Sequence, residues 1–154
     1  LRVGGPLATR AVAAVWGSHG DQSFARAADG GFYFWGQPPD GGAPVETPTE
    51  LAELRDGSVT QVASSGTHVL ALSRGGDVHA WGEGASGALG LQLLGALPHP
   101  CQQPSLNKLD IVALSCGDAP HVLALESARA GPNRIFAWGR NGKGELGLPR
   151  AECT

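Results

Sequence analysis

The chain has 154 residues, a length that suits one domain with a hydrophobic core of its own. Charged residues make up 16% of it, below the roughly 25% usual for soluble domains, while its 24 glycines and 11 prolines favour turn-rich β structure over a helical bundle. A net charge of -3 without a Lys- or Arg-rich run argues against nucleic acid as a partner, and the absence of a long apolar run or a signal-peptide pattern argues against a membrane span. We therefore expect an intracellular, cytoplasmic protein, with nuclear or cytoskeletal association left open.

Three units of similar sequence follow one another along the chain, and each begins with three runs that predict β-strands. In every unit a Gly-containing turn separates the second run from the third, which indicates a β-hairpin. The units are 11–58, 59–109 and 110–150. Their runs are 11–16, 22–26 and 32–36 in the first unit, 59–63, 68–72 and 78–82 in the second, and 111–114, 121–125 and 135–139 in the third.

The first unit departs most from the other two. It carries Gln22 where the others carry His68 and His121, and its third run ends in Trp35-Gly36 without a Gly-rich segment like theirs. Residues 45–55 follow, and we interpret them as a short helical turn or a solvated loop between units.

The second and third units share a Gly-rich segment, which begins at Trp81-Gly82 and at Trp138-Gly139. Both segments fit W-G-x-x-x-x-G-x-L-G at every fixed position. The second unit continues into a Leu-rich and then Pro-rich stretch, 91–104, which we interpret as the link to the next unit. The third unit carries four extra residues in the turn 127–133, where an insertion is well tolerated.

This pattern resembles the repeats of the regulator of chromosome condensation family. Residues 59–72 follow the first half of that repeat, V-x-x-V-x-C-G-x-x-H-x-x-A-L, with Ser64 and Ser65 in place of Cys-Gly. The third unit has the Cys-Gly pair as Cys116-Gly117, with one extra residue before His121. The resemblance implies an all-β fold, a β-propeller of four-stranded antiparallel blades with seven blades in the ring. Because such a ring needs roughly 350 residues, we expect residues 1–154 to form a partial propeller of about three blades.

The positions that recur in the repeat are interpreted as structural. The tryptophans are expected to pack between neighbouring blades, with Gly permitting close approach of the backbone, and the leucines to anchor the Gly-rich loops. The histidines are expected to make structural hydrogen bonds, since equivalent residues a blade apart cannot converge on one site. These positions are Trp35, Gly36, His68, Trp81, Gly82, Leu89, Gly90, His121, Trp138, Gly139, Leu146 and Gly147.

No motif in the sequence predicts catalytic residues, a metal site or a cofactor site. The Gly-rich segments lack the phosphate-loop pattern, and Ser64 and Ser65 lie near a histidine without a G-x-S-x-G elbow or an acidic partner. Cys101, Cys116 and Cys153 are too few and too widely spaced for a paired framework or a zinc site, so we expect free thiols, with Cys116 buried.

Together these features favour a non-catalytic protein-interaction or scaffold module that belongs to a larger propeller or assembly. Its expected partner is a protein, with no membrane and no nucleic acid. The resemblance implies an alternative, guanine-nucleotide exchange on a small GTPase, because some family members insert a propeller loop beside the nucleotide site. Chromatin binding is disfavoured by the acidic balance of charge.

Overall fold

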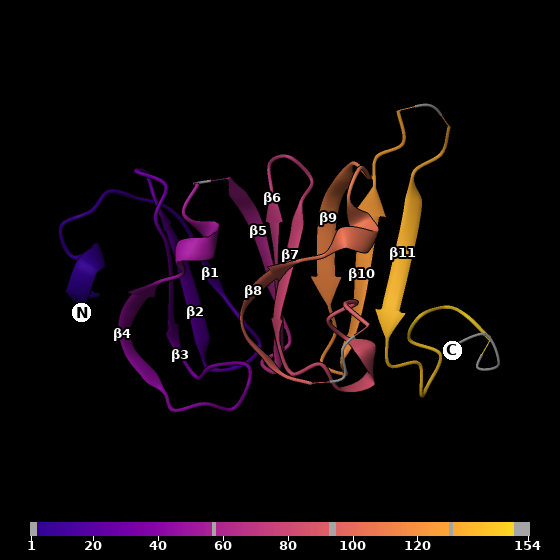
Figure 1. The fold of residues 1–154 in the computed structure, drawn as a ribbon, viewed down its shortest axis with the longest axis horizontal. Helices are drawn as coiled ribbons and strands as arrows, with labels where there is room; N and C mark the ends of the chain where they lie inside the picture. The colour runs from indigo at the N-terminus through magenta and orange to yellow at the C-terminus, as the bar shows by residue number, and fades with distance from the viewer. Residues whose placement is uncertain (1–2, 57, 93–94, 130, 150–154) are drawn as a thin grey trace.

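A computed structural model shows three antiparallel β-sheets that stand in a row from the N-terminus to the C-terminus (Figure 1). It describes residues 3–56, 58–92, 95–129 and 131–149. Neighbouring strands in each sheet are neighbours in sequence, so every sheet is a simple up-and-down meander. The strands are β1 (Val12–Gly17), β2 (Gln22–Ala27), β3 (Phe32–Gly36) and β4 (Val45–Glu50) in sheet 1; β5 (Val59–Ser64), β6 (His68–Ser73), β7 (Val78–Gly82) and β8 (Leu97–Gln102) in sheet 2; and β9 (Ile111–Cys116), β10 (His121–Glu126) and β11 (Arg134–Gly139) in sheet 3.

The pairing register repeats from sheet to sheet. In the central hairpin, Gln22 pairs with Gly36, His68 with Gly82, and His121 with Gly139. A change of one residue in this register would turn every side chain to the opposite face, so the shared register places equivalent residues on equivalent faces. The predicted all-β fold of antiparallel blades is confirmed, and each sheet falls within one of the three sequence units.

The fourth strand of a blade is present in sheets 1 and 2, where the sequence had suggested a turn or a link. The expectation for 45–55 was wrong for 45–50, which form β4, whereas a short helical turn is present at 52–54 as η2. The link 91–104 contains β8. Both strands are interrupted by proline, Pro48 in one and Pro98 and Pro100 in the other. Proline is tolerated in edge strands because its missing N–H faces away from the sheet. These segments are therefore extended although their sequences do not predict strands.

A short 3-10 turn precedes each sheet and buries one leucine. The turns are η1 (Gly5–Leu7), η2 (Ala52–Leu54) and η4 (Pro104–Leu106), and a fourth turn, η3 (Ala85–Gly87), lies in the Gly-rich segment of the second unit. Leu7, Leu54 and Leu106 are buried, and each lies five residues before the first residue of the strand that follows. This leucine is a repeat position that the sequence reading had missed.

Two hydrophobic cores lie between the sheets. Phe24, Phe32 and Phe34 of sheet 1 pack against Val69 and Trp81 of sheet 2. The second core joins sheet 2 to sheet 3 and contains Leu70, Leu72, Val78, Ala80, Leu89, Leu106, Ile111, Leu114, Val122 and Ala124. The sheets therefore pack face to face, as propeller blades do.

Candidate functional site

The glycine of each Trp-Gly pair occupies a position that no other residue fits. Gly36, Gly82 and Gly139 have φ of +103°, +106° and +95°, in the region that side chains rarely adopt. A Cβ atom there would lie 2.0, 2.5 and 2.4 Å from a backbone carbonyl oxygen. That carbonyl belongs to Asp21 in the first unit, to Thr67 in the second and to Pro120 in the third.

The same carbonyl accepts a hydrogen bond from the residue after the glycine. The amide of Gln37 donates to Asp21 over 2.7 Å, that of Glu83 to Thr67 over 2.7 Å, and that of Arg140 to Pro120 over 2.8 Å. Each Trp-Gly pair thus fastens the end of the third strand to the loop before the second. The pairs hold the loops at this end of the sheets in fixed positions.

The tryptophans of the second and third units pack on the preceding sheet. Trp81 is buried, with its ring centroid 6.2 Å from that of Phe24 and an interplanar angle of 79°, an edge-to-face contact. Trp138 is half-buried and donates its indole N–H to the carbonyl of Ala88 over 2.9 Å. Trp35 lies on the outer face of sheet 1, where it packs against the cluster around Leu7.

The Gly-rich segment of the second unit is anchored between sheets 2 and 3. Leu89 is buried in the core, and Gln103 donates to its carbonyl. Gly90 has φ of +66°, and a Cβ there would lie 3.0 Å from the indole nitrogen of Trp138. In the third unit, Leu146 is half-buried and Gly147 is exposed with φ of +69°.

His68 is buried at the start of β6, and its ring nitrogen Nδ1 lies 2.7 Å from Ser65 Oγ. Its Nε2 is buried without a hydrogen-bond partner among the described residues. Burial, and secondly the charge of His121, lowers the pKa of His68 to about 4. With so low a pKa, the His68 ring is neutral near pH 7 and a weak base.

His121 takes the equivalent place in the third unit. Its Nδ1 lies 3.0 Å from the carbonyl oxygen of Ala119. A Cβ on Gly117 would lie 1.9 Å from the His121 ring, which explains the glycine after Cys116. The charge of His121 is also the second cause of the lowered pKa of His68.

Gln22 replaces the histidine in the first unit and bridges to the next blade. It is buried, and its amide nitrogen donates to the carbonyl of Gly66 over 2.6 Å. Ser64 Oγ donates to its amide oxygen, also over 2.6 Å. This repeat position therefore fixes one blade to the loop of its neighbour.

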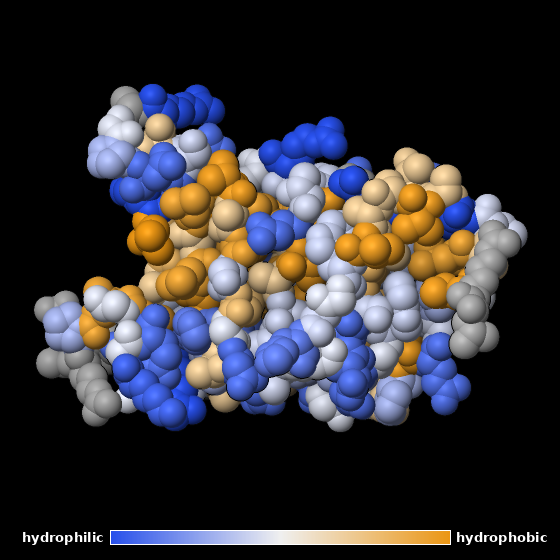
Figure 2. All heavy atoms as spheres, turned by 180° about the vertical axis from the view of Figure 1, so that it is seen from behind, coloured by the Kyte–Doolittle hydropathy of each residue, from blue (hydrophilic) through white to orange (hydrophobic). Residues whose placement is uncertain are grey.

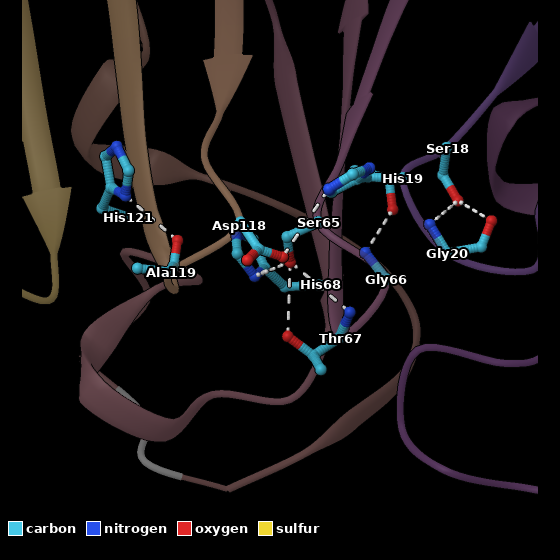
Figure 3. A network of polar contacts seen from close by, with 11 residues as sticks. Ser18, His19, Gly20, Ser65, Gly66, Thr67, His68, Asp118, Ala119 and His121 are labelled. Atoms are coloured by element: carbon cyan, nitrogen blue, oxygen red, sulfur yellow. Dashed lines mark hydrogen bonds and ion pairs between the residues drawn. The ribbon is translucent and has the colours of Figure 1, made fainter.

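Three loops meet at the end of the sheets where these contacts lie (Figure 3). They are 18–21, 65–67 and 117–120, and we call them the loop surface. A Cβ on Gly20 would lie 2.9 Å from the Cα of Gly66, so the first two loops touch through their backbones. The exposed side chains of His19 and Asp118 approach to 3.9 Å and join the first loop to the third. Sequence spacing gave no sign of this convergence, because it depends on how the blades curve.

The opposite end of sheets 2 and 3 carries two polar hollows of about 420 and 460 Å³. Lys108, Asp110 and Arg129 line both of them. In the second hollow, Arg134 pairs with Glu126, whose pKa this hydrogen-bonded partner lowers. Because opposite charges alternate here, neither hollow selects one sign of ligand.

The side chains that could bind a metal ion or react as thiols are spread over the described residues. Among them, no three side chains of His, Cys, Asp or Glu lie together as metal ligands would. Cys101 is exposed, and Cys116, which was expected to be buried, is half-buried. Its partial burial raises the pKa of its thiol to about 12, so that thiol is a poor nucleophile. Cys153 lies outside the described residues. Within the same part of the chain, no helix has the length and apolar character that a membrane crossing requires.

Sequence comparison finds the same repeat. The pattern of the regulator of chromosome condensation (RCC1) repeat matches residues 75–125, and a second pattern with the same description matches 59–88. The human probable E3 ubiquitin-protein ligase HERC3 is 34% identical over 130 residues, which are 80% of this chain and 12% of HERC3. The chain therefore spans a small part of this relative.

Structural comparison agrees. The crystal structure of human WBSCR16 matches with a TM-score of 0.71 and 28% identity, covering 99% of this chain and 40% of that one. Two structures of yeast Prp20, one bound to Kap60 and one from Saccharomyces cerevisiae described with its binding properties to Gsp1p and histones, match at TM-scores of 0.62 and 0.57. At 20% identity they cover 76% and 75% of this chain, and 30% and 31% of their own, and they show the fold alone. The chain belongs to the family built from regulator of chromosome condensation repeats, and its sheets are blades of that β-propeller fold.

Proposed function

We propose that this chain is a non-catalytic protein-interaction module, part of a larger propeller or assembly, and that the loop surface is its contact face. The observation that carries the proposal is the meeting of loops from all three blades at one end. The exposed pair His19 and Asp118 joins loops that are about 100 residues apart in sequence. A partner bound there would contact three repeats at once.

The loop surface rests on a base held by hydrogen bonds between blades. At the loop end, Gln22 donates to the carbonyl of Gly66 over 2.6 Å and accepts from Ser64 Oγ over 2.6 Å. Further along the strands, Gln61 makes two hydrogen bonds to the backbone of Leu114. Because these contacts fix neighbouring blades, the loops need little ordering when a partner binds, which favours affinity. Exposed loops on such a scaffold are the usual place for binding residues.

The comparisons support the larger assembly. The chain spans 40% of WBSCR16 and 12% of HERC3, and Prp20 was solved in complex with Kap60. These relatives are consistent with a protein partner. The side chains of His19, Thr67 and Asp118 are polar and exposed, which also suits such a partner. A cytoplasmic location fits the same role.

Guanine-nucleotide exchange on a small GTPase is the second candidate. It is favoured by the binding of Prp20p to Gsp1p, although Prp20p shares only 20% identity with this chain. Fold likeness does not confer such an activity, since exchange depends on one face and one loop.

Affinity capture with the 154-residue chain and a double variant of the loop surface tests the leading proposal. We expect His19→Ala with Asp118→Ala to lose the captured partner at an unchanged melting temperature, because both side chains are exposed. Arg129→Ala, an exposed cation at the opposite end of the sheets, is the matched control and should retain it. Equal capture by all three proteins would contradict the loop surface as the contact face.

Release of a fluorescent guanine nucleotide from a panel of small GTPases separates the two candidates. We expect release at the intrinsic rate with and without the chain. If the wild type accelerated nucleotide release and the double loop variant did not, the chain would be an exchange factor and the scaffold proposal would fail.

A further inference from the structure

The loop surface contains an exposed histidine beside a carboxylate. His19 Nε2 lies 3.9 Å from Asp118 Oδ1, and the two side chains are 74% and 88% exposed (Figure 3). The pair joins a loop of sheet 1 to a loop of sheet 3, although sheet 2 packs between these sheets. Histidine is the side chain whose charge ordinarily changes between pH 5 and 8. The pair is therefore a place where the loops can respond to acidity.

The turn that carries His19 is held by the residue before it. Ser18 Oγ donates to the carbonyl of Gly20 over 2.9 Å and accepts from the amide of Gly20 over 3.1 Å. The carbonyl of Gly20 also accepts from the amide of Gln22 over 2.8 Å. A hydroxyl that bonds the backbone two residues on closes a turn, so His19 lies at the tip of a fixed turn with its side chain in solvent.

The turn that carries Asp118 is closed by the residues on either side of it. The amide of Gly117 donates to the carbonyl of His121 over 3.3 Å, and the amide of His121 donates to the carbonyl of Ala119 over 2.6 Å. Asp118 therefore also projects from a fixed turn. Because both turns are already ordered, less conformational freedom is lost when their side chains pair than between two mobile loops.

Charge decides what happens between these turns. On the face drawn in Figure 2, hydrophilic residues predominate along the lower edge, the end of the sheets at which the loops lie. Loop 65–67 has no charged or titratable side chain, and of the histidines at the loop bases, His121 is half-buried and His68 is buried, with its pKa lowered to about 4 by burial. The remaining charged residues of these loops and of the segments hydrogen-bonded to them are Asp21, Glu83 and Arg140. Since Asp118 lies within ion-pair distance of His19, protonation of His19 adds an attraction between the first loop and the third.

We propose that His19 and Asp118 form a pH-operated latch across the loop surface, which closes when His19 is protonated in mild acid and opens at neutral pH. In the closed state the imidazolium and the carboxylate attract each other. In the open state the imidazole is neutral, and the carboxylate is free for a donor group of a partner. Because both side chains are exposed, the latch changes an equilibrium by about two- to fivefold, as solvent-exposed ion pairs do.

The consequence of the latch rests on the proposed function, because the loops that it joins are the proposed contact face. Protonated His19 engages Asp118 within the chain, so both groups are less available to a partner. Binding at the loop surface should therefore weaken as the pH falls. The latch itself belongs to the free chain and is tested without a partner.

Hydrogen exchange of the purified 154-residue chain at about pH 5.5 and about pH 7.5 tests the latch. At the lower pH we expect His19→Gln to exchange about two- to fivefold faster than the wild type at the amides of Gln22 and His121, one from each turn. At the higher pH the two proteins should exchange alike, because the latch is open. NaCl at about 1 M, which screens charges beyond roughly 3 Å, should remove the difference at the lower pH.

Asp118→Asn removes the other half of the latch and should give the same change. The double variant His19→Gln, Asp118→Asn should exchange no faster than either single variant, because one substitution already opens the latch. His99→Gln is the matched control, since His99 is also exposed beside a carboxylate, 3.5 Å from Glu53, and neither residue belongs to the loop surface. It should exchange as the wild type does at both amides.

Melting temperatures at each pH identify a variant that has lost its fold, and the salt dependence of the wild type, which needs no substitution, then decides. Equal exchange of the wild type and His19→Gln at the lower pH would overturn the latch. A difference of the same size at the higher pH would also overturn it, because His19 would then act without its charge.

Partner capture at the two pH values tests the consequence. The wild type should lose about two- to fivefold more binding than His19→Gln between pH 7.5 and pH 5.5, and the comparison cancels groups of the partner that titrate in this range. Equal losses would remove the regulatory role. Failure of the loop surface itself shows differently, as equal capture at neutral pH by the wild type and the His19→Ala, Asp118→Ala double variant.

Discussion

Among single residues, Trp81 shows how an aromatic position in the repeat becomes part of the core. It is buried and meets Phe24 of the preceding sheet edge to face. Replacing a buried Trp by Ala removes its burial and leaves a cavity, so we expect Trp81→Ala to lower the free energy of unfolding by about 3 to 5 kcal/mol. Urea denaturation measures the loss.

Trp35→Ala is the control for this change, because Trp35 is half-buried on the outer face of sheet 1. Its loss should be clearly smaller. Equal losses for both variants, or a loss below about 1 kcal/mol for Trp81→Ala, would contradict the packing described for Trp81.

His68 gives the fold a dependence on pH. Its pKa is about 4 in the folded protein because of burial, against 6.5 for an ordinary histidine. Between these values the unfolded chain binds more protons than the folded one, so stability is highest above pH 6.5 and falls as the pH drops towards 4. We expect a loss of up to about 3 kcal/mol from this group.

Thermal unfolding of His68→Gln between pH 4 and 7 measures that contribution. Gln occupies the equivalent position in the first unit as Gln22, so the variant should cost little at pH 7 and lose much of the pH dependence. His79, whose pKa burial also lowers, remains in both proteins and sets the background. If the melting temperature of the variant depended on pH as that of the wild type does, protonation of His68 would not destabilise the fold.

At the scale of elements, one side chain fastens β5 to β9. Gln61 donates to the carbonyl of Leu114 over 2.7 Å and accepts from the amide of the same residue over 3.0 Å. Gln61→Ala leaves both groups unpaired, so we expect a loss of about 1 to 3 kcal/mol and faster hydrogen exchange at the Leu114 amide. Gln61→Glu keeps the acceptor and should retain protection there; equal exchange in all three proteins would rule out this contact.

The elements that sequence predicted well are those with a local signal. The central hairpins combine apolar runs with glycine turns, and the structure forms these hairpins in all three units. β4 and β8 were missed because Pro48 and Pro100 are signals for a loop, although both prolines are buried in extended edge strands. Local propensity and tertiary context disagree in these strands, and the packing of the sheet decides.

The candidate site was harder to predict than the fold. The repeat positions of Trp81, Gly82 and Leu89 were visible in sequence, and the structure places them at the base of the loops. The approach of His19 to Asp118 was not visible, because neither residue belongs to the repeat pattern. Their meeting depends on the angle between blades, which side chains from several strands set together.

For the whole molecule, the row of blades presents loops from all three sheets at one end. These loops carry exposed polar side chains and are fastened to their own blades by backbone hydrogen bonds. WBSCR16, which this chain matches over 40% of its length, shows that such blades occur within a larger propeller.

Hydrogen exchange of the chain with and without its captured partner tests most directly whether the loop surface is the contact face. We predict that protection on binding is concentrated in 18–21, 65–67 and 117–120, with the opposite turns 28–31 and 74–77 unchanged. Protection confined to those turns, with the three loops exchanging as in the free chain, would contradict the account.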